Sequence, residues 1–179
     1  MKFIDSENQY GLISILNHWS GAVLVILMLG IGLYFHEMPK GDALTYWKGL
    51  HISLGVLFFP FLLFRVIWHF PGKTPDPIEQ ARYLQIAAKA VHHLLLAGII
   101  IMIFSGPLMI WSKGYPVRLF DILSIPGPFG EIEPLHETLE VIHKVTSRVL
   151  LVLITLHFIA ALKHVFIDRD STLKRILGR

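Results

Sequence analysis

The chain has 179 residues, of which 54% are hydrophobic and only 16% are charged. A soluble globular domain carries about 25% charged residues, so this composition places the chain among integral membrane proteins. Cysteine is absent, which excludes disulfides, thiolate metal sites and iron–sulfur clusters. The net charge of +3 comes without clustered basic patches and interleaved aromatic residues, which excludes nucleic acid as a partner.

Four apolar runs follow one another along the chain, at residues 12–35, 51–70, about 86–111 and about 139–167. Each run reaches the roughly 20 apolar residues that a membrane-spanning helix needs. The segments between them contain the Gly and Pro residues that are typical of turns and loops. The sequence therefore predicts an all-α integral membrane protein, a single domain over residues 1–179 built as a bundle of four transmembrane helices.

The positions of Lys and Arg predict the orientation, because cytoplasmic segments of membrane proteins carry an excess of both. Ten lie at the N-terminus, around the second loop or at the C-terminus: Lys2, Arg65, Lys73, Arg82, Lys89, Lys163, Arg169, Lys174, Arg175 and Arg179. Six lie around the first and third loops: Lys40, Lys48, Lys113, Arg118, Lys144 and Arg148. We therefore expect both termini in the cytoplasm.

The ten histidines are an unusual number for so apolar a chain. Four of them, in and beside the fourth run, are separated by multiples of seven residues: His136, His143, His157 and His164. A helix places such residues on one stripe, with His143 and His157 about 21 Å apart along the axis. A stripe of imidazoles in lipid must face the bundle and be satisfied there. Paired histidines that bind haem iron would satisfy it.

Each candidate ligand needs a partner at the same depth on another helix. His18 lies near the start of the first run, at the depth of His157, and His51 begins the second run at the face where His143 lies. These depths predict two haem sites, His18 with His157 and His51 with His143, one in each leaflet. The alternative is a histidine-lined transporter without haem. A proton pathway would more often contain buried carboxylates, whereas every acid here lies at a helix end or in a loop.

Several segments resemble the prokaryotic cytochrome b561 family over nearly the whole chain. They include Tyr-Gly-Leu-Ile-Ser-Ile-Leu-Asn-His-Trp at 10–19, His-Ile-Ser-Leu-Gly at 51–55, Phe-Arg-Val-Ile-Trp at 64–68, and Val-His-His at 91–93. The remaining segments are Ile-His at 142–143, Leu-His at 156–157 and His-Val-Phe-Ile-Asp-Arg-Asp-Ser-Thr-Leu-Lys-Arg at 164–175. Members of this family are four-helix di-haem cytochromes linked to quinone, related to the cytochrome b subunits of hydrogenases and formate dehydrogenases.

The resemblance implies the same two axial pairs that the depths predict. One departure concerns His136, which begins a family-like His-Glu-Thr-Leu string. Only His143, however, has the fourteen-residue spacing to His157 that the family shows. His136 would lie about 31 Å from His157, too far for two haems inside the hydrocarbon core. We therefore expect His143 to be the ligand.

Further residues are candidate contacts to haem propionates or to quinone. Arg65 and His92 lie near the cytoplasmic ends of their helices, beside the predicted His18–His157 haem. Arg65 would equally serve as a cation that anchors its helix at the membrane interface. The other two candidates are His164, at the cytoplasmic end of the histidine stripe, and Arg148, whose charge within the span needs a counter-ion. His36 and His69 are expected to be interfacial only.

These features predict a di-haem b-type cytochrome of the bacterial inner (cytoplasmic) membrane, a candidate oxidoreductase. The resemblance implies ubiquinone or menaquinone as electron acceptor, and some family members oxidise superoxide at the periplasmic face. The cations expected there, Lys40, Lys48, Lys113 and Arg118, share their loops with seven acids, so superoxide is neither supported nor excluded as the donor. The alternative is an anchor subunit that relays electrons between quinone and a separate redox protein.

Overall fold

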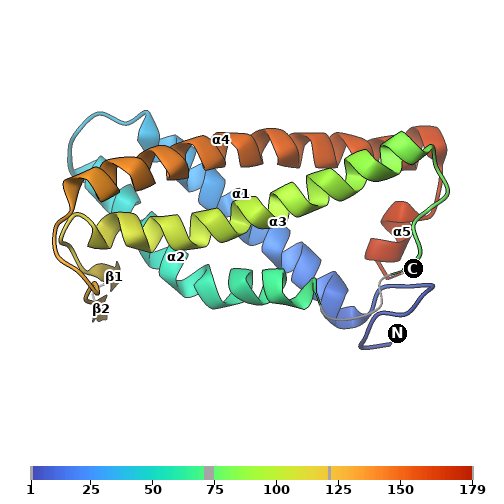
Figure 1. Cartoon of the computed structure of the whole chain (residues 1–179), viewed down its shortest axis with the longest axis horizontal. Helices are drawn as coiled ribbons and strands as arrows, with labels where there is room; N and C mark the ends of the chain where they lie inside the picture. Colours follow the sequence, from blue (N-terminus) through green and yellow to red (C-terminus); the bar gives the residue numbers. More distant parts are fainter. Residues whose placement is uncertain (1, 71–74, 121, 179) are drawn as a thin grey trace.

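Four long helices make up most of the molecule (Figure 1): α1 (Leu12–His36), α2 (Asp42–Trp68), α3 (Arg82–Trp111) and α4 (Glu133–Lys163). The computed structural model describes residues 2–70, 75–120 and 122–178. Each of the four helices is long and apolar enough to cross a membrane, which confirms the predicted helical bundle. Lys73 and Arg179, two of the cations that predicted the orientation, lie outside the described residues.

Three of the helices begin before the apolar runs that predicted them. α2 starts at Asp42 rather than at residue 51, α3 at Arg82 rather than 86, and α4 at Glu133 rather than 139. Hydropathy marks the part of a helix that lies in hydrocarbon, whereas helical hydrogen bonding continues into the interface, where polar side chains are tolerated. His51 and His143 consequently lie about two to three turns inside their helices.

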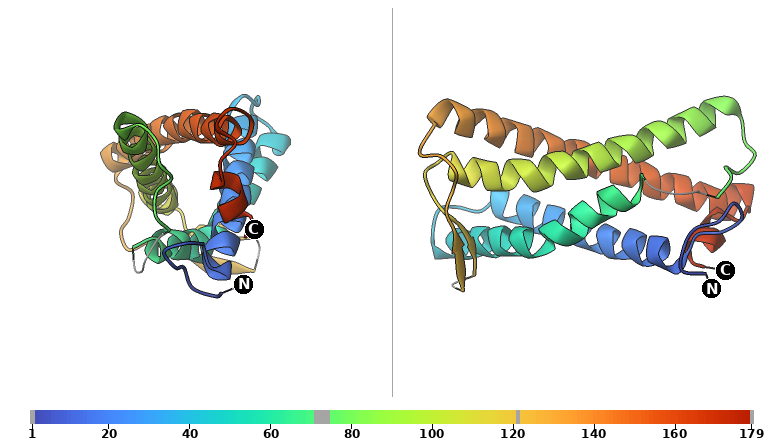
Figure 2. Two further views of the ribbon diagram at one scale, coloured as in Figure 1. Left: turned by 90° about the vertical axis from the view of Figure 1, so that its right-hand side faces the viewer. Right: turned by 60° about the horizontal axis from the view of Figure 1, so that its bottom comes forward.

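The four long helices are arranged around a common interior, as the view along the bundle in Figure 2 shows. α3 packs most extensively against α4, and α2 packs against both α1 and α3. Five buried residues of α2 and α3 form the central cluster: Leu62, Val66, Leu96, Ile99 and Ile103. The middle of the bundle, between the two levels at which the histidines lie, is therefore packed with apolar side chains.

The outer surface of the bundle is also apolar. Large side chains such as Val23, Phe61, Phe104 and Val152 are exposed along its helices. A monomer in water rarely exposes so extended an apolar surface. In a bilayer the same side chains face hydrocarbon, as expected for a membrane protein.

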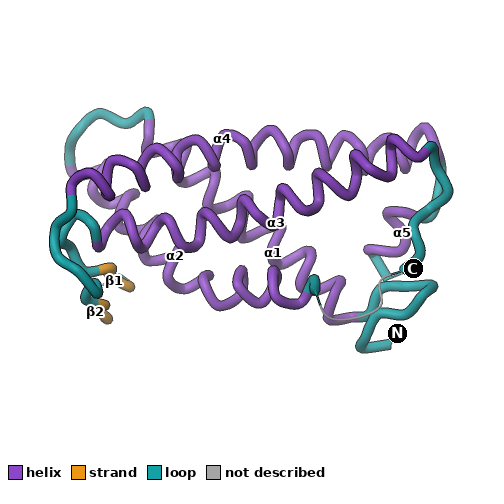
Figure 3. The backbone as a smooth tube through the Cα atoms, in the orientation of Figure 1, coloured by secondary structure: helices purple, strands orange, loops and turns teal. Residues whose placement is uncertain are grey.

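The third loop contains a hairpin that the sequence did not predict, drawn in orange in Figure 3. It consists of the antiparallel strands β1 (Val117–Leu119) and β2 (Leu123–Ile125). The Ser53 hydroxyl of α2 donates to the carbonyl oxygen of Arg118 at 3.3 Å and accepts the N–H of Phe120 at 2.7 Å. Because these bonds hold the hairpin against α2, Val117 is only 2% exposed.

Both ends of the described chain lie at the end of the bundle opposite the hairpin (Figure 1). After α4 the backbone widens into the π-helical turn η1 (His164–Asp168), reverses at Arg169 with φ of 54°, and forms the short helix α5 (Thr172–Ile176). The indole N–H of Trp19 donates to the carbonyl oxygen of Ile176 at 3.0 Å. This bond fixes the C-terminal segment to α1.

The close approach of α3 and α4 depends on Gly98. A Cβ atom at this position would lie 2.5 Å from Cδ2 of Leu150, a side chain that is only 1% exposed. We expect Gly98→Val to destabilise the protein by about 1–3 kcal/mol, the usual cost of overpacking, measured as a lower midpoint of thermal unfolding in detergent.

Gly30→Val is the matched control, because a Cβ atom on Gly30 of α1 meets nothing within 4 Å. Adding Leu150→Ala to Gly98→Val should recover part of the loss, since the two side chains compete for one space. Equal destabilisation by the two glycine substitutions would contradict this account of the packing.

Candidate functional site

His51 of α2 and His143 of α4 face each other near the hairpin end of the bundle. Their ring centroids are 6.5 Å apart, with an angle of 85° between the ring planes. Phe35 of α1 packs edge-on against His51 with centroids 5.4 Å apart. A Cβ atom on Gly32 would lie 3.3 Å from Cε1 of His51, tighter than an ordinary contact, so a glycine at residue 32 favours the close approach of α1 to this ring.

The two imidazoles of this pair have different hydrogen-bonding environments. Nδ1 of His143 lies 2.8 Å from the hydroxyl oxygen of Ser105 on α3. A proton on Nδ1 that is donated to Ser105 leaves Nε2 free as a metal ligand. Nδ1 of His51 is buried and has no hydrogen-bond partner among the described residues. A buried polar atom without a partner is costly, which is typical of a site that a bound group completes.

An apolar cavity extends from this pair toward the middle of the bundle. Besides the two histidines, its lining includes Met28 of α1, Val56 of α2, Met102 of α3 and, from the hairpin, Val117. Because β1 supplies Val117, the hairpin forms part of the cavity wall. A large planar apolar group held between His51 and His143 would lie in these surroundings.

The second pair lies toward the opposite end of the bundle. The ring centroids of His18 on α1 and His157 on α4 are 6.2 Å apart, with an angle of 55° between the planes. His92 of α3 adds a third ring, 5.3 Å from His157. Its neighbour His93 is exposed and contacts the carbonyl oxygen of Lys89 through Nδ1 at 2.7 Å.

Arg65 of α2 reaches across this end to α1. Its guanidinium donates to the carbonyl oxygen of Asn17 at 3.3 Å and lies 3.3 Å from Nδ1 of His18. An arginine can only donate, so in this contact Nδ1 of His18 accepts and the proton of the neutral ring is on Nε2. A Cβ atom on Gly21 would collide with the Arg65 side chain, so this glycine leaves room for the crossing.

The residues present fit a haem between each pair. A nitrogen ligand lies about 2 Å from a metal, and a ring centre roughly 1 Å behind its nitrogen, so two imidazoles across one metal lie about 6 Å apart. The observed 6.2 and 6.5 Å match this separation. The two levels are about 21 Å apart along α4, close enough for both to lie within one bilayer.

His136, the competing candidate for the fourth run, lies elsewhere. Its Nδ1 is 2.9 Å from the carbonyl oxygen of Met109 on α3, and its Nε2 is 3.9 Å from Glu140. The structure therefore brings His143 next to His51 and engages His136 in a contact between the ends of α3 and α4.

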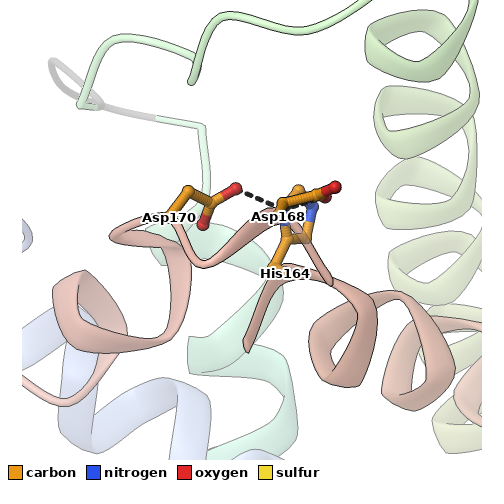
Figure 4. Close-up of side chains that lie close together, drawn as sticks. All are labelled: His164, Asp168 and Asp170. Carbon is orange, nitrogen blue, oxygen red and sulfur yellow. Dashed lines mark hydrogen bonds and ion pairs between the residues drawn. The ribbon is translucent and has the colours of Figure 1, made fainter. Parts of the chain in front are cut away.

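His164, predicted as a quinone or propionate contact, lies in a small polar cluster drawn in Figure 4. Its Nδ1 is 2.6 Å from Asp170 and 3.3 Å from Asp168, and Lys163 also pairs with Asp168. Asp170 in turn accepts the N–H of Thr172 at the start of α5. Partial burial would raise the pKa of Asp170, but hydrogen bonds from Thr172 and His164 outweigh it and lower that pKa. The cluster therefore stabilises the turn into α5.

Arg148 lies away from both pairs. It is exposed and stands about 160° around α4 from the buried Leu150. No described residue forms an ion pair or hydrogen bond with it. This position does not favour the predicted contact with a propionate beside His143. His36 and His69 are exposed at the ends of α1 and α2.

Sequence reasoning missed two parts of the site. Ser105 was not singled out, although a serine followed by a glycine in an apolar run is a signal for close polar contact between membrane helices. The hairpin that carries Val117 was not expected either, because its three-residue strands are too short to show alternation.

Comparisons with known proteins place the chain in a family. A family model described as prokaryotic cytochrome b561 matches residues 9–179. The chain is 31% identical to cytochrome b561 homolog 2 of Escherichia coli (strain K12) over 182 residues, which cover 100% of this chain and 96% of the relative. It is 25% identical to cytochrome b561 homolog 1 of the same organism over 183 residues, covering 96% and 98% respectively. The matched region contains all four facing histidines.

The contact between Ser105 and His143 gives a prediction for haem affinity. We expect Ser105→Ala to weaken haem binding at the His51–His143 site by about 10- to 100-fold, the usual effect of removing a residue that orients a metal-binding histidine. The measurement is the rate of haem loss to excess apomyoglobin. Ser147→Ala is the control, because the Ser147 hydroxyl contacts only its own helix. Equal rates of loss from the two variants would count against the orienting role.

Proposed function

We propose that this chain, which belongs to the prokaryotic cytochrome b561 family, holds two haems b and transfers electrons between a donor at the hairpin end and the quinone pool. Membrane electron transfer is the activity of the family. The observation that carries the two-haem proposal is the spacing of the two histidine pairs, 6.2 and 6.5 Å between ring centroids. Each pair unites two helices at one depth of the membrane.

Haem, when bound, supplies reversible one-electron oxidation and reduction. The chain's own residues fix where this chemistry takes place. His51 and His143 would hold one haem, with His143 oriented by Ser105 so that its Nε2 is available to the metal. His18 and His157 bind at the other level, and the apolar residues between the levels exclude water from the middle of the bundle.

Binding at His18 changes the role of Arg65. A neutral His18 that binds metal through Nε2 carries its proton on Nδ1 and no longer accepts from the guanidinium. Arg65 would then keep its bond to the Asn17 carbonyl oxygen but lose the contact with His18, which would leave part of a half-buried guanidinium open to another acceptor. A haem propionate is a suitable partner, because arginine binds carboxylates with two parallel hydrogen bonds.

We propose that quinone, either ubiquinone or menaquinone, reacts at the His18–His157 end. His92 is the residue of interest, because its ring is 5.3 Å from His157 without belonging to the facing pair. A quinone takes up protons at its carbonyl oxygens on reduction, and an imidazole N–H can donate there. The excess of Lys and Arg around the chain termini supports a cytoplasmic location for this end in a bacterial inner membrane.

The electron donor at the hairpin end is either superoxide or a redox protein. Two cations at this end are paired with acids: Lys113 with Glu133 at 2.9 Å and Lys144 with Glu140 at 2.6 Å. These pairings weaken the positive field that would attract superoxide. They leave the anchor-subunit function as the second candidate, and Arg148, a cation exposed within the apolar span of α4, favours it.

Substitution of the histidines tests the haem sites. His143→Ala should remove one of the two haems and His157→Ala the other, while His136→Ala should leave both, because His136 contacts Met109. Haem per chain is measured as the pyridine haemochrome, together with reduced-minus-oxidised spectra. A colourless wild-type protein would instead support a transporter, and loss of haem from His136→Ala but not His143→Ala would reverse the assignment.

The role of His92 is tested by the oxidation of reduced protein with a soluble ubiquinone analogue in a stopped-flow experiment. We expect His92→Leu to slow this reaction by about 100-fold, within the range for loss of a general acid. His93→Leu is the matched control, because His93 faces Lys89. A protein that reduces quinone with superoxide as its only donor acts alone, whereas inactivity with superoxide indicates a subunit.

A further inference from the structure

Arg148 lies near the middle of Glu133–Asp168, the segment of α4 and η1 that is long and apolar enough to cross a membrane. A Cβ atom on Gly106 would be 3.5 Å from Cε1 of His143, so these residues share one level. Trp111 lies five residues beyond Gly106 and marks the interface, as tryptophans do. Counted along the helices, Arg148 is about 15 Å inside the level of Trp111.

The opposite interface is at a similar distance. The indole N–H of Trp68 donates to the hydroxyl of Ser14 at 2.9 Å, which places both one turn beyond His18. Since His18 faces His157, Arg148 is about 20 Å from the level of Trp68 and Ser14. In a hydrocarbon core about 30 Å thick, a distance of about 15 Å is far longer than an arginine side chain, so snorkelling alone leaves the guanidinium in hydrocarbon.

The side of α4 that carries Arg148 has the pattern of a helix-packing surface. Six exposed residues are spaced by four, three, four, three and four positions and form what we call the outer seam: Val141, Val145, Arg148, Val152, Thr155 and Ile159. This 3.5-residue repeat is the one by which helices pack along a seam. The Thr155 hydroxyl is bonded to Leu151 of its own helix, and no described element covers the outer seam.

A second copy of the chain does not supply a counter-charge. All 13 Asp and Glu residues lie in loops or near helix ends. The closest acid on α4 is Glu140, about 12 Å nearer the interface than Arg148 and paired with Lys144. In a parallel dimer the same residues lie at the same depth in both copies. Glu140 of one copy would therefore still lie about 12 Å from the depth of Arg148 of the other.

We propose that the outer seam of α4 binds a transmembrane helix of another protein that carries an Asp or Glu at the level of Arg148. A cation within a bilayer is almost always paired, and a carboxylate is the natural partner of a guanidinium. The valines around Arg148 give a partner helix an apolar surface to pack against, and Thr155 is a small residue of the kind found where membrane helices meet. The proposal does not depend on the haem sites and concerns the assembly in which the chain works.

The test uses a synthetic leucine-rich helix of about 20 residues with one central glutamate, reconstituted in liposomes with the full chain. Association is measured by energy transfer between labels on the peptide and on the C-terminal segment. We expect association about tenfold tighter with the wild type than with Arg148→Gln, and equally weak association for a peptide with central glutamine. Lys144→Gln, which removes a cation paired with Glu140, should bind like the wild type.

Cross-linking gives the second measurement and is possible because the chain has no cysteine. Val152→Cys on the outer seam should form a disulfide with a cysteine at the matching depth of the glutamate peptide. Phe61→Cys is the control, an exposed position of α2 at nearly the same depth. Equal cross-linking at both positions, equal binding by wild type and Arg148→Gln, or no binding at all would overturn the proposal.

Discussion

A polar ring in hydrocarbon must find a partner, and this constraint shapes the molecule more than any other. Imidazoles on one helix cannot reach each other across fourteen residues, so each needs polar or metal-binding groups from other helices at its own depth. His143 obtains His51 and Ser105, whereas His157 obtains His18 and His92. The arrangement of α1 and α2 around α4 follows from these two histidine pairs, and apolar side chains fill the space between the pairs.

Helix packing and the hairpin also help to place the histidine rings inside the bundle. Glycines at positions 21 and 32 of α1 leave room for Arg65 and for the His51 ring, and Gly98 lets α3 approach Leu150. Ser53 bonds the hairpin to α2, and the hairpin adds Val117 to the apolar lining of the cavity beside His51 and His143.

The four helices could be predicted because each run of apolar residues has the length of a bilayer. The histidine pairs could be predicted as well, since a seven-residue period fixes both direction and depth. Arg148 was placed by depth alone, although five residues past His143 is about 140° around a helix and already turns it outward. Ser105 and the hairpin depend on contacts between distant segments, which no local pattern of residues contains.

Since α4 contributes one residue to each pair, the length of α4 between these two residues sets the distance between the pairs. The interval between His143 and His157 cannot change by a single amino acid, because an insertion of one residue would rotate one ring by about 100° relative to the other. Only a whole seven-residue unit would restore the direction, and it would lengthen the interval by about 10 Å. Length variation in homologous chains should therefore be confined to loops and tails, and this stretch of α4 should keep a fixed number of residues.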